Sequence, residues 1–244
     1  MEALFNQFSR QFYTDLIVLI VAIYGLSISI IKKKKHPLLR LFPFYFIAYI
    51  ILILILYISL ISYFDSSSSH KMSKIVMGSD YIFTLIEFLI FMHFFYNIIN
   101  GTSKKRLIVL LITLFSLAYI FYLANDLIHY KIIKSDTVTV VYTLESAVLL
   151  IPSVFYYFQI FTKPPTINLI RESSFWVVTG IFFSMICSLP YCIVENYLKK
   201  FNSELYAQLF AILYILYCLL FLMIIKAYFC ENDDLKYELN ANPE

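Results

Sequence analysis

Seven long apolar segments constrain the fold of this chain more than any other feature of its sequence. A helix needs about 20 residues to cross the hydrocarbon core of a membrane. Segments of about this length are found at 12–31, 41–63, 75–99, 107–124, 138–160, 175–197 and 205–229. Charged residues make up only 14% of the chain, against about 25% in soluble domains. This composition excludes a soluble enzyme, a secreted disulfide scaffold and a nucleic-acid binder.

Each apolar segment is expected to be an α-helix. Inside a membrane every backbone N–H and C=O group must bond within the protein, which only helices and closed barrels achieve. Barrel strands alternate polar and apolar residues, whereas residues 50–56 form an unbroken apolar run. The sequence therefore predicts an all-α fold, with one seven-helix transmembrane domain over residues 1–230. A short acidic tail is expected over residues 231–244.

The distribution of basic residues predicts the orientation of the chain. Of the 19 Lys and Arg, 12 fall on the side that carries the lysine run 32–35 and 7 fall on the other. Because Lys and Arg accumulate on the cytoplasmic side, we expect the N-terminus outside and the C-terminus in the cytoplasm. Aromatic clusters near the helix ends, among them residues 42–45, 94–96 and 155–158, are expected to form a belt at the inner membrane surface.

Two glutamates inside the apolar segments are the main candidates for a functional site. Glu87 lies nine residues from Tyr96 and Glu145 eleven from Tyr156, which places both at a depth of about 13–17 Å. This is near the middle of a hydrocarbon core of about 30 Å, where a carboxylate costs about 2.5–3.5 kcal/mol. No Lys or Arg lies at that depth in any segment. We therefore expect both side chains to face the bundle interior, with at least one protonated or bonded to hydroxyl groups.

Neighbours at helical spacing extend this candidate site. Thr84 shares a helix face with Glu87, and Tyr142 shares one with Glu145. The expected ligand or proton site comprises Glu87, Glu145, Thr84, Tyr142, Asp80 and Ser146. Ionisable groups inside a membrane usually mark a ligand, proton or ion pathway. The alternative left open is that both glutamates only hold helices together through hydroxyls such as those of Tyr142, Ser146, Ser188 and Tyr217.

Other residue types give no sign of enzymatic chemistry. His93 is the only histidine inside an apolar segment and is expected to be a satisfied packing residue, and the motifs HExxH and GxSxG do not occur. The four cysteines lack CxxC spacing. We therefore predict no catalytic residue, metal site or cofactor. Pro152 and Pro190 each remove a backbone hydrogen bond and are expected to kink their helices, which opens space for a ligand.

A further set of residues carries a resemblance to known proteins. It comprises Tyr81, Glu87, Phe95, Tyr96, the run 142–146, Phe175, Trp176 and Gly180. In these positions the chain resembles a group of small uncharacterised bacterial seven-helix integral membrane proteins, over roughly residues 75–229. The resemblance implies a bacterial cytoplasmic membrane and a sensory module that works with a separate signalling protein.

These features together predict a receptor-like or sensory multi-pass membrane protein. A cationic or hydrogen-bonding ligand, or a proton, is expected to enter from the outer face and change the charge state of Glu87 and Glu145. Repacking around Pro152 and Pro190 would carry the change to the cytoplasmic loops. The expected partners are the lipid bilayer, a small ligand or cation and a signalling protein, with no nucleic acid. Two alternatives stay open: a small proton- or cation-coupled transporter, and a structural partner of another membrane protein.

Overall fold

The computed structural model describes residues 2–32, 36–63, 69–130, 135–162, 169–201 and 203–230. Within these ranges the chain is all-helical, which confirms the all-α part of the prediction, whereas seven crossings and the orientation stay predictions. The helices are α1 (Glu2–Lys32), α2 (Phe42–Tyr63), α3 (Ser69–Ile98), α4 (Thr102–Tyr130), α5 (Ser135–Phe161), α6 (Ser173–Phe201) and α7 (Ser203–Ala227). Two short 3-10 helices, η2 (Pro37–Leu39) and η3 (Leu169–Arg171), precede α2 and α6. The predicted acidic tail 231–244 and the lysines 33–35 lie outside the described residues.

Six helices in the described part of the chain, α1 to α6, are long and apolar enough to cross a membrane. The apolar part described for α7, Ile212–Ala227, is shorter. This makes the chain a multi-pass, membrane-compatible protein. Several helices extend past the apolar segments: α1 begins at Glu2 and α4 ends at Tyr130. Apolarity marks only the part of a helix that matches the hydrocarbon core, whereas the helical hydrogen bonds continue into the polar ends.

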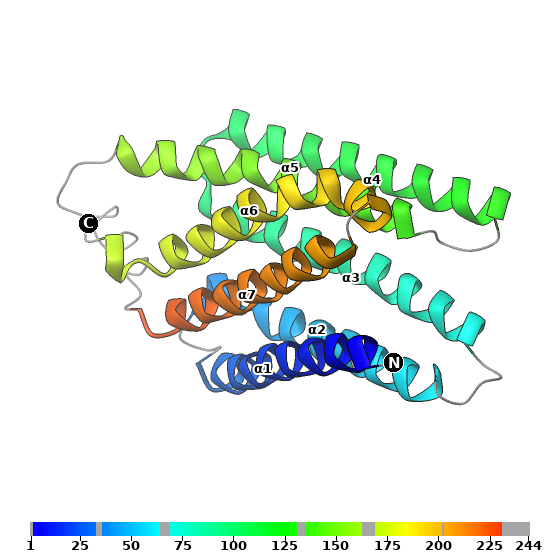
Figure 1. Cartoon of the computed structure of the whole chain (residues 1–244). Helices are drawn as coiled ribbons and strands as arrows, with labels where there is room; N and C mark the ends of the chain where they lie inside the picture. Colours follow the sequence, from blue (N-terminus) through cyan, green and yellow to red (C-terminus); the bar gives the residue numbers. More distant parts are fainter. Residues whose placement is uncertain are drawn as a thin grey trace, which may run out of the picture.

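Contacts between the helices give their order around the bundle. The sequence α1, α2, α3, α5, α6, α7 forms a ring in which α7 returns to α1. Helix α4 packs outside this ring against α3 and α5, and only 17% of its apolar window is buried, against 50% for α6. Successive helices run in opposite directions (Figure 1). Helix α1 begins at one end of the bundle, here called the N-terminal end, and α7 ends at the other, the C-terminal end.

The close packing of α6 on α7 depends on Gly180. A methyl group at this position would lie 2.9 Å from Met223 Cβ and 3.2 Å from Leu220 Cδ1, because small residues let membrane helices approach closely. We expect Gly180→Ala to cost about 1–3 kcal/mol through overpacking. The matched control is Gly78→Ala on α3, where the added methyl group meets nothing within 4 Å. Equal unfolding temperatures for the two purified variants would contradict this account.

The aromatic clusters near the helix ends form a surface belt only in part. Counting also the cluster at 228–229, their exposed members are Phe44, Tyr96, Phe158 and Phe229, and their members at most 2% exposed are Phe42, Tyr45, Phe94, Phe95, Tyr156 and Tyr228. The rings of the second set therefore pack inside the bundle and not on its surface. The end of a bundled helix turns only part of its circumference to lipid, so the remaining rings point into the core.

Candidate functional site

Glu87 lies in the interior of the bundle, and its side chain is fully buried. Tyr45 Oη of α2 donates a hydrogen bond to Glu87 Oε1 at 2.8 Å, and Tyr217 Oη of α7 donates one to Oε2 at 3.2 Å. The hydroxyl groups of Tyr217 and Tyr142 of α5 are also hydrogen-bonded to each other. The network therefore joins α2, α3, α5 and α7 around one carboxyl group, both oxygens of which accept a bond.

Glu145 lies one turn beyond Tyr142 on α5 and is also fully buried. Neither of its carboxyl oxygens has a hydrogen-bond partner in the described part of the structure. Its side chain is within electrostatic range of Glu87. A buried polar group without a partner costs about 1–3 kcal/mol, so such a group calls for an explanation. The two glutamates therefore differ: both oxygens of Glu87 accept hydrogen bonds from tyrosines, whereas those of Glu145 have no partner among the described residues.

The other predicted site residues contribute less to this network. The Thr84 hydroxyl is buried and donates to the backbone carbonyl of Asp80, on its own helix, at 2.9 Å. The Ser146 hydroxyl pairs with that of Ser188 on α6 at 3.5 Å. Asp80 is half-buried and lies within electrostatic range of Tyr217. The hydroxyl groups of Thr84 and Ser146 thus have partners other than the two glutamates. The hydrogen bonds to the Glu87 carboxyl group come from tyrosines.

Tyr45 is the site residue that the sequence analysis missed, because it was assigned to the aromatic belt. It is completely buried and donates the shorter of the two bonds to Glu87. One signal could have revealed it: Phe42, Tyr45, Phe46 and Tyr49 recur at the spacing of one helix face, which is typical of a core-facing stripe.

Polar groups lead from Glu87 towards the N-terminal end of the bundle. Asp15 of α1 accepts a hydrogen bond from Tyr214, which lies one turn before Tyr217 on α7. Tyr49 packs on Tyr217 with ring centroids 5.7 Å apart. Tyr49 also lies within electrostatic range of both Asp15 and Glu87. These side chains place hydroxyl groups between the carboxyl groups of Glu87 and Asp15.

A second line of polar groups leads from Glu145 in the same direction. Thr139 Oγ1 of α5 donates a hydrogen bond to Glu195 Oε2 of α6 at 3.0 Å. Cys192, one turn before Glu195, is buried and lies within electrostatic range of both Glu195 and Glu145. Both lines therefore connect the central carboxyl groups with acidic residues near the N-terminal end.

Aromatic rings close the site on the side of the C-terminal end. The Tyr45 ring packs against Phe91 and Phe221, with centroid distances of 5.1 and 5.5 Å. Phe42 forms the next layer, 6.3 Å from Phe91. All four rings are completely buried. The polar neighbours of the carboxyl groups thus lie towards the N-terminal end, and this aromatic layer lies towards the C-terminal end.

Pro152 and Pro190 lie inside the continuous helices α5 and α6. Pro152 is buried, whereas Pro190 is exposed. Pro190 is located between Ser188 and Cys192, on the stretch of α6 that borders Glu145. Each proline lacks the N–H group that would bond to the preceding turn, so both mark points at which these helices can bend. The kinks themselves stay predictions.

Metal-ligating side chains and thiols are the remaining chemically reactive groups of the described chain. Among the residues that the structure describes, no three His, Cys, Asp or Glu are grouped so that they could hold a metal ion. All four cysteines are free thiols. Beyond the end of α7, burial raises the pKa of the Cys230 thiol, with smaller opposing effects from Lys226 and Lys32. A raised pKa is unlike that of an activated nucleophile.

Comparisons of the chain with models of protein families, with curated proteins and with solved structures find no match.

Proposed function

We propose that this chain is a receptor-like or sensory protein of a bacterial cytoplasmic membrane, with seven membrane crossings and its N-terminus outside. Its ligand is a small cation, a hydrogen-bonding molecule or a proton that reaches Glu145 from the N-terminal end. One observation carries this proposal: Glu145 is fully buried beside Glu87, and both of its oxygens lack a partner among the described residues. A bound cation would supply the positive charge that no side chain provides at this depth.

The hydrogen-bond network suggests how occupancy of Glu145 would be transmitted. Glu87 is tied to α2 and α7 through Tyr45 and Tyr217, whereas Glu145 belongs to α5. A cation at Glu145 changes the repulsion between the two carboxyl groups and thereby favours a different position of α5 relative to α2 and α7. Pro152 lies two turns further along α5, where such a shift would bend the helix. A separate signalling protein would detect this change at the C-terminal end.

A thermal-stability screen tests the proposed binding. Purified protein is heated with small ammonium compounds and inorganic cations over a range of pH. A ligand that binds only the folded state at 100 times its Kd stabilises it by about 2.7 kcal/mol, and we expect Glu145→Gln to remove this effect. The matched control is Glu172→Gln at the C-terminal end, where Glu172 accepts a bond from Ser174. A ligand or pH effect that survives Glu145→Gln would contradict the proposal.

A small proton- or cation-coupled transporter is the second candidate. The two lines of polar groups near Glu87 and Glu145, the second of which includes the Cys192 thiol, favour it, because transporters use chains of ionisable groups as proton relays in the membrane. Uptake driven by a pH gradient into proteoliposomes, lost in Glu87→Gln, would support transport. Saturable binding without uptake would support the receptor. A protein that co-purifies in a fixed ratio, and equally with Glu87→Gln and Glu145→Gln, would instead indicate that the chain is a structural partner of another membrane protein.

A further inference from the structure

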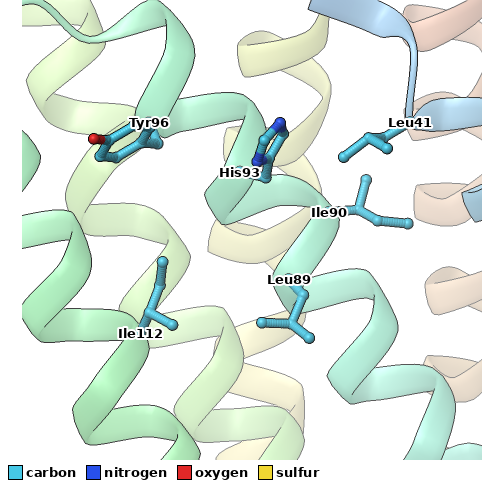
Figure 2. A pocket seen from close by; sticks show the side chains of 6 residues that line it. All are labelled: Leu41, Leu89, Ile90, His93, Tyr96 and Ile112. Atoms are coloured by element: carbon cyan, nitrogen blue, oxygen red, sulfur yellow. The ribbon is translucent and has the colours of Figure 1, made fainter.

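A recess on the membrane-facing side of α3 and α4 lies apart from the carboxyl site. It has a volume of about 390 Å³ and is lined by Leu41, Leu89, Ile90, His93, Tyr96 and Ile112. Figure 2 shows His93 between Tyr96 and Leu41, with Leu89 and Ile112 on the same side of it. Both Leu89 and Tyr96 are more than one-third exposed. The recess is therefore open to the surroundings of the bundle.

The imidazole of His93 is unusual in this position. His93 is exposed, so the expectation that it is a satisfied packing residue is wrong. In the described structure its backbone carbonyl accepts a bond from the Asn97 side chain, but no described residue bonds to the ring. A polar group placed against hydrocarbon without a partner costs free energy. An exposed imidazole near the helix end, to which no described residue bonds, is therefore available to bond a polar group from outside the chain.

The polarity of the recess changes in three steps with depth. At the helix ends lie two cations: Arg40 is exposed next to Leu41, and Lys105 Nζ lies 5.1 Å from the centroid of the Tyr96 ring. His93 lies three residues before Tyr96, about 4.5 Å deeper at the rise of an α-helix. Deeper still, about 10 Å from Lys105 along α4, Ile112 provides an apolar floor together with Leu89.

The geometry points to a binding site for one anionic phospholipid of the surrounding membrane. Its phosphate contacts Arg40 and Lys105, the ester groups of its glycerol accept a hydrogen bond from His93, and one acyl chain lies along Leu89 and Ile112. From its headgroup inwards, this molecule carries negative charge, hydrogen-bond acceptors and hydrocarbon, in the same order as the cations beside the recess, the imidazole and the apolar floor. The apolar helix face of a second copy of the chain would cover the floor but would leave His93 without a partner.

Native mass spectrometry of the full-length protein tests the charge of this ligand. The protein in detergent micelles is mixed with phosphatidylglycerol or phosphatidylcholine of identical acyl chains. We expect one retained phosphatidylglycerol per chain and a preference over phosphatidylcholine that falls about 5-fold for Arg40→Gln and about 5-fold for Lys105→Gln. The matched control is Arg106→Gln, which removes a neighbouring exposed cation that does not follow the face of Lys105 and Ile112. A preference unchanged in the double variant Arg40→Gln with Lys105→Gln would overturn the proposal.

Two further variants separate the imidazole from the acyl-chain floor. His93→Leu is expected to weaken retention of both lipids without changing the preference between them. Ile112→Trp fills the recess and is expected to abolish retention, whereas Ile120→Trp, at a position on α4 that is 59% exposed, leaves it intact. If Ile112→Trp changed the oligomeric state and not the lipid count, the recess would be a contact between two copies and the lipid site would be refuted.

Discussion

Replacement of Glu145 by leucine is expected to make the protein more stable and, at the same time, unresponsive to its ligand. Both carboxyl oxygens of Glu145 are buried without a partner among the described residues, and a group of this kind destabilises a fold by about 1–3 kcal/mol. Leucine fills a similar volume without a polar atom, so unfolding of the purified protein should require a higher temperature or more denaturant. Glu145→Gln serves as the control, because it keeps an unpartnered polar group and should give no such gain.

The sign of this effect distinguishes a binding site from a purely structural contact. If Glu145 only held helices together, its removal would cost free energy, since interhelical hydrogen bonds in membranes contribute about 0.6 kcal/mol on average. Residues kept for function often reduce stability. Loss of stability in Glu145→Leu would therefore favour the structural interpretation and contradict the proposed site.

Replacement of Glu87 by leucine is expected to have the opposite effect on stability. The carboxyl group of Glu87 accepts the hydroxyl hydrogens of Tyr45 and Tyr217, and its loss leaves the buried Tyr45 hydroxyl without its acceptor. An orphaned buried hydroxyl costs about 1–3 kcal/mol, so Glu87→Leu should unfold at a lower temperature than the unmodified protein.

A double-mutant cycle shows whether the loss in Glu87→Leu comes from this hydrogen bond. Tyr45→Phe removes the hydroxyl, so the double variant Tyr45→Phe with Glu87→Leu no longer contains an orphaned group. We expect it to be less destabilised than the sum of the two single variants, by about 0.5–3 kcal/mol. Strict additivity would mean that the two side chains do not act as a pair.

The helical class and the membrane-compatible length of α1 to α6 could be predicted from the sequence because the thickness of a bilayer sets the length of an apolar segment. The burial of Glu87 and Glu145 was predicted for a similar reason, since a charged group in lipid is costly. The helix lengths and the burial of the two glutamates depend only on distance along the chain and on depth in the membrane. Both quantities follow from the spacing of residues in the sequence.

The partners of the carboxyl groups could not be predicted, because they depend on how each helix is rotated about its axis. Tyr45 and Phe44 are neighbours in sequence, yet Tyr45 is completely buried and bonded to Glu87 while Phe44 is 55% exposed. The order of the helices around the bundle could not be predicted from residue spacing either. Helix α4 lies outside the ring because α3 contacts α5 directly. His93 was misjudged for the same reason, since only the rotation of α3 turns its imidazole outwards.

Labelling with a hydrophobic carbodiimide tests most directly whether Glu145 is the glutamate of the pair whose carboxyl group has no hydrogen-bond partner in the protein. This reagent enters membranes and forms stable adducts with carboxyl groups in apolar surroundings, and peptide mass spectrometry locates the adduct. The account predicts an adduct at Glu145 and little at Glu87, whose oxygens are both bonded to tyrosines. The cation that stabilises the protein should protect Glu145 from the reagent. An adduct at Glu87 with Glu145 unmodified, or labelling of Glu145 that the stabilising cation does not reduce, would contradict the account.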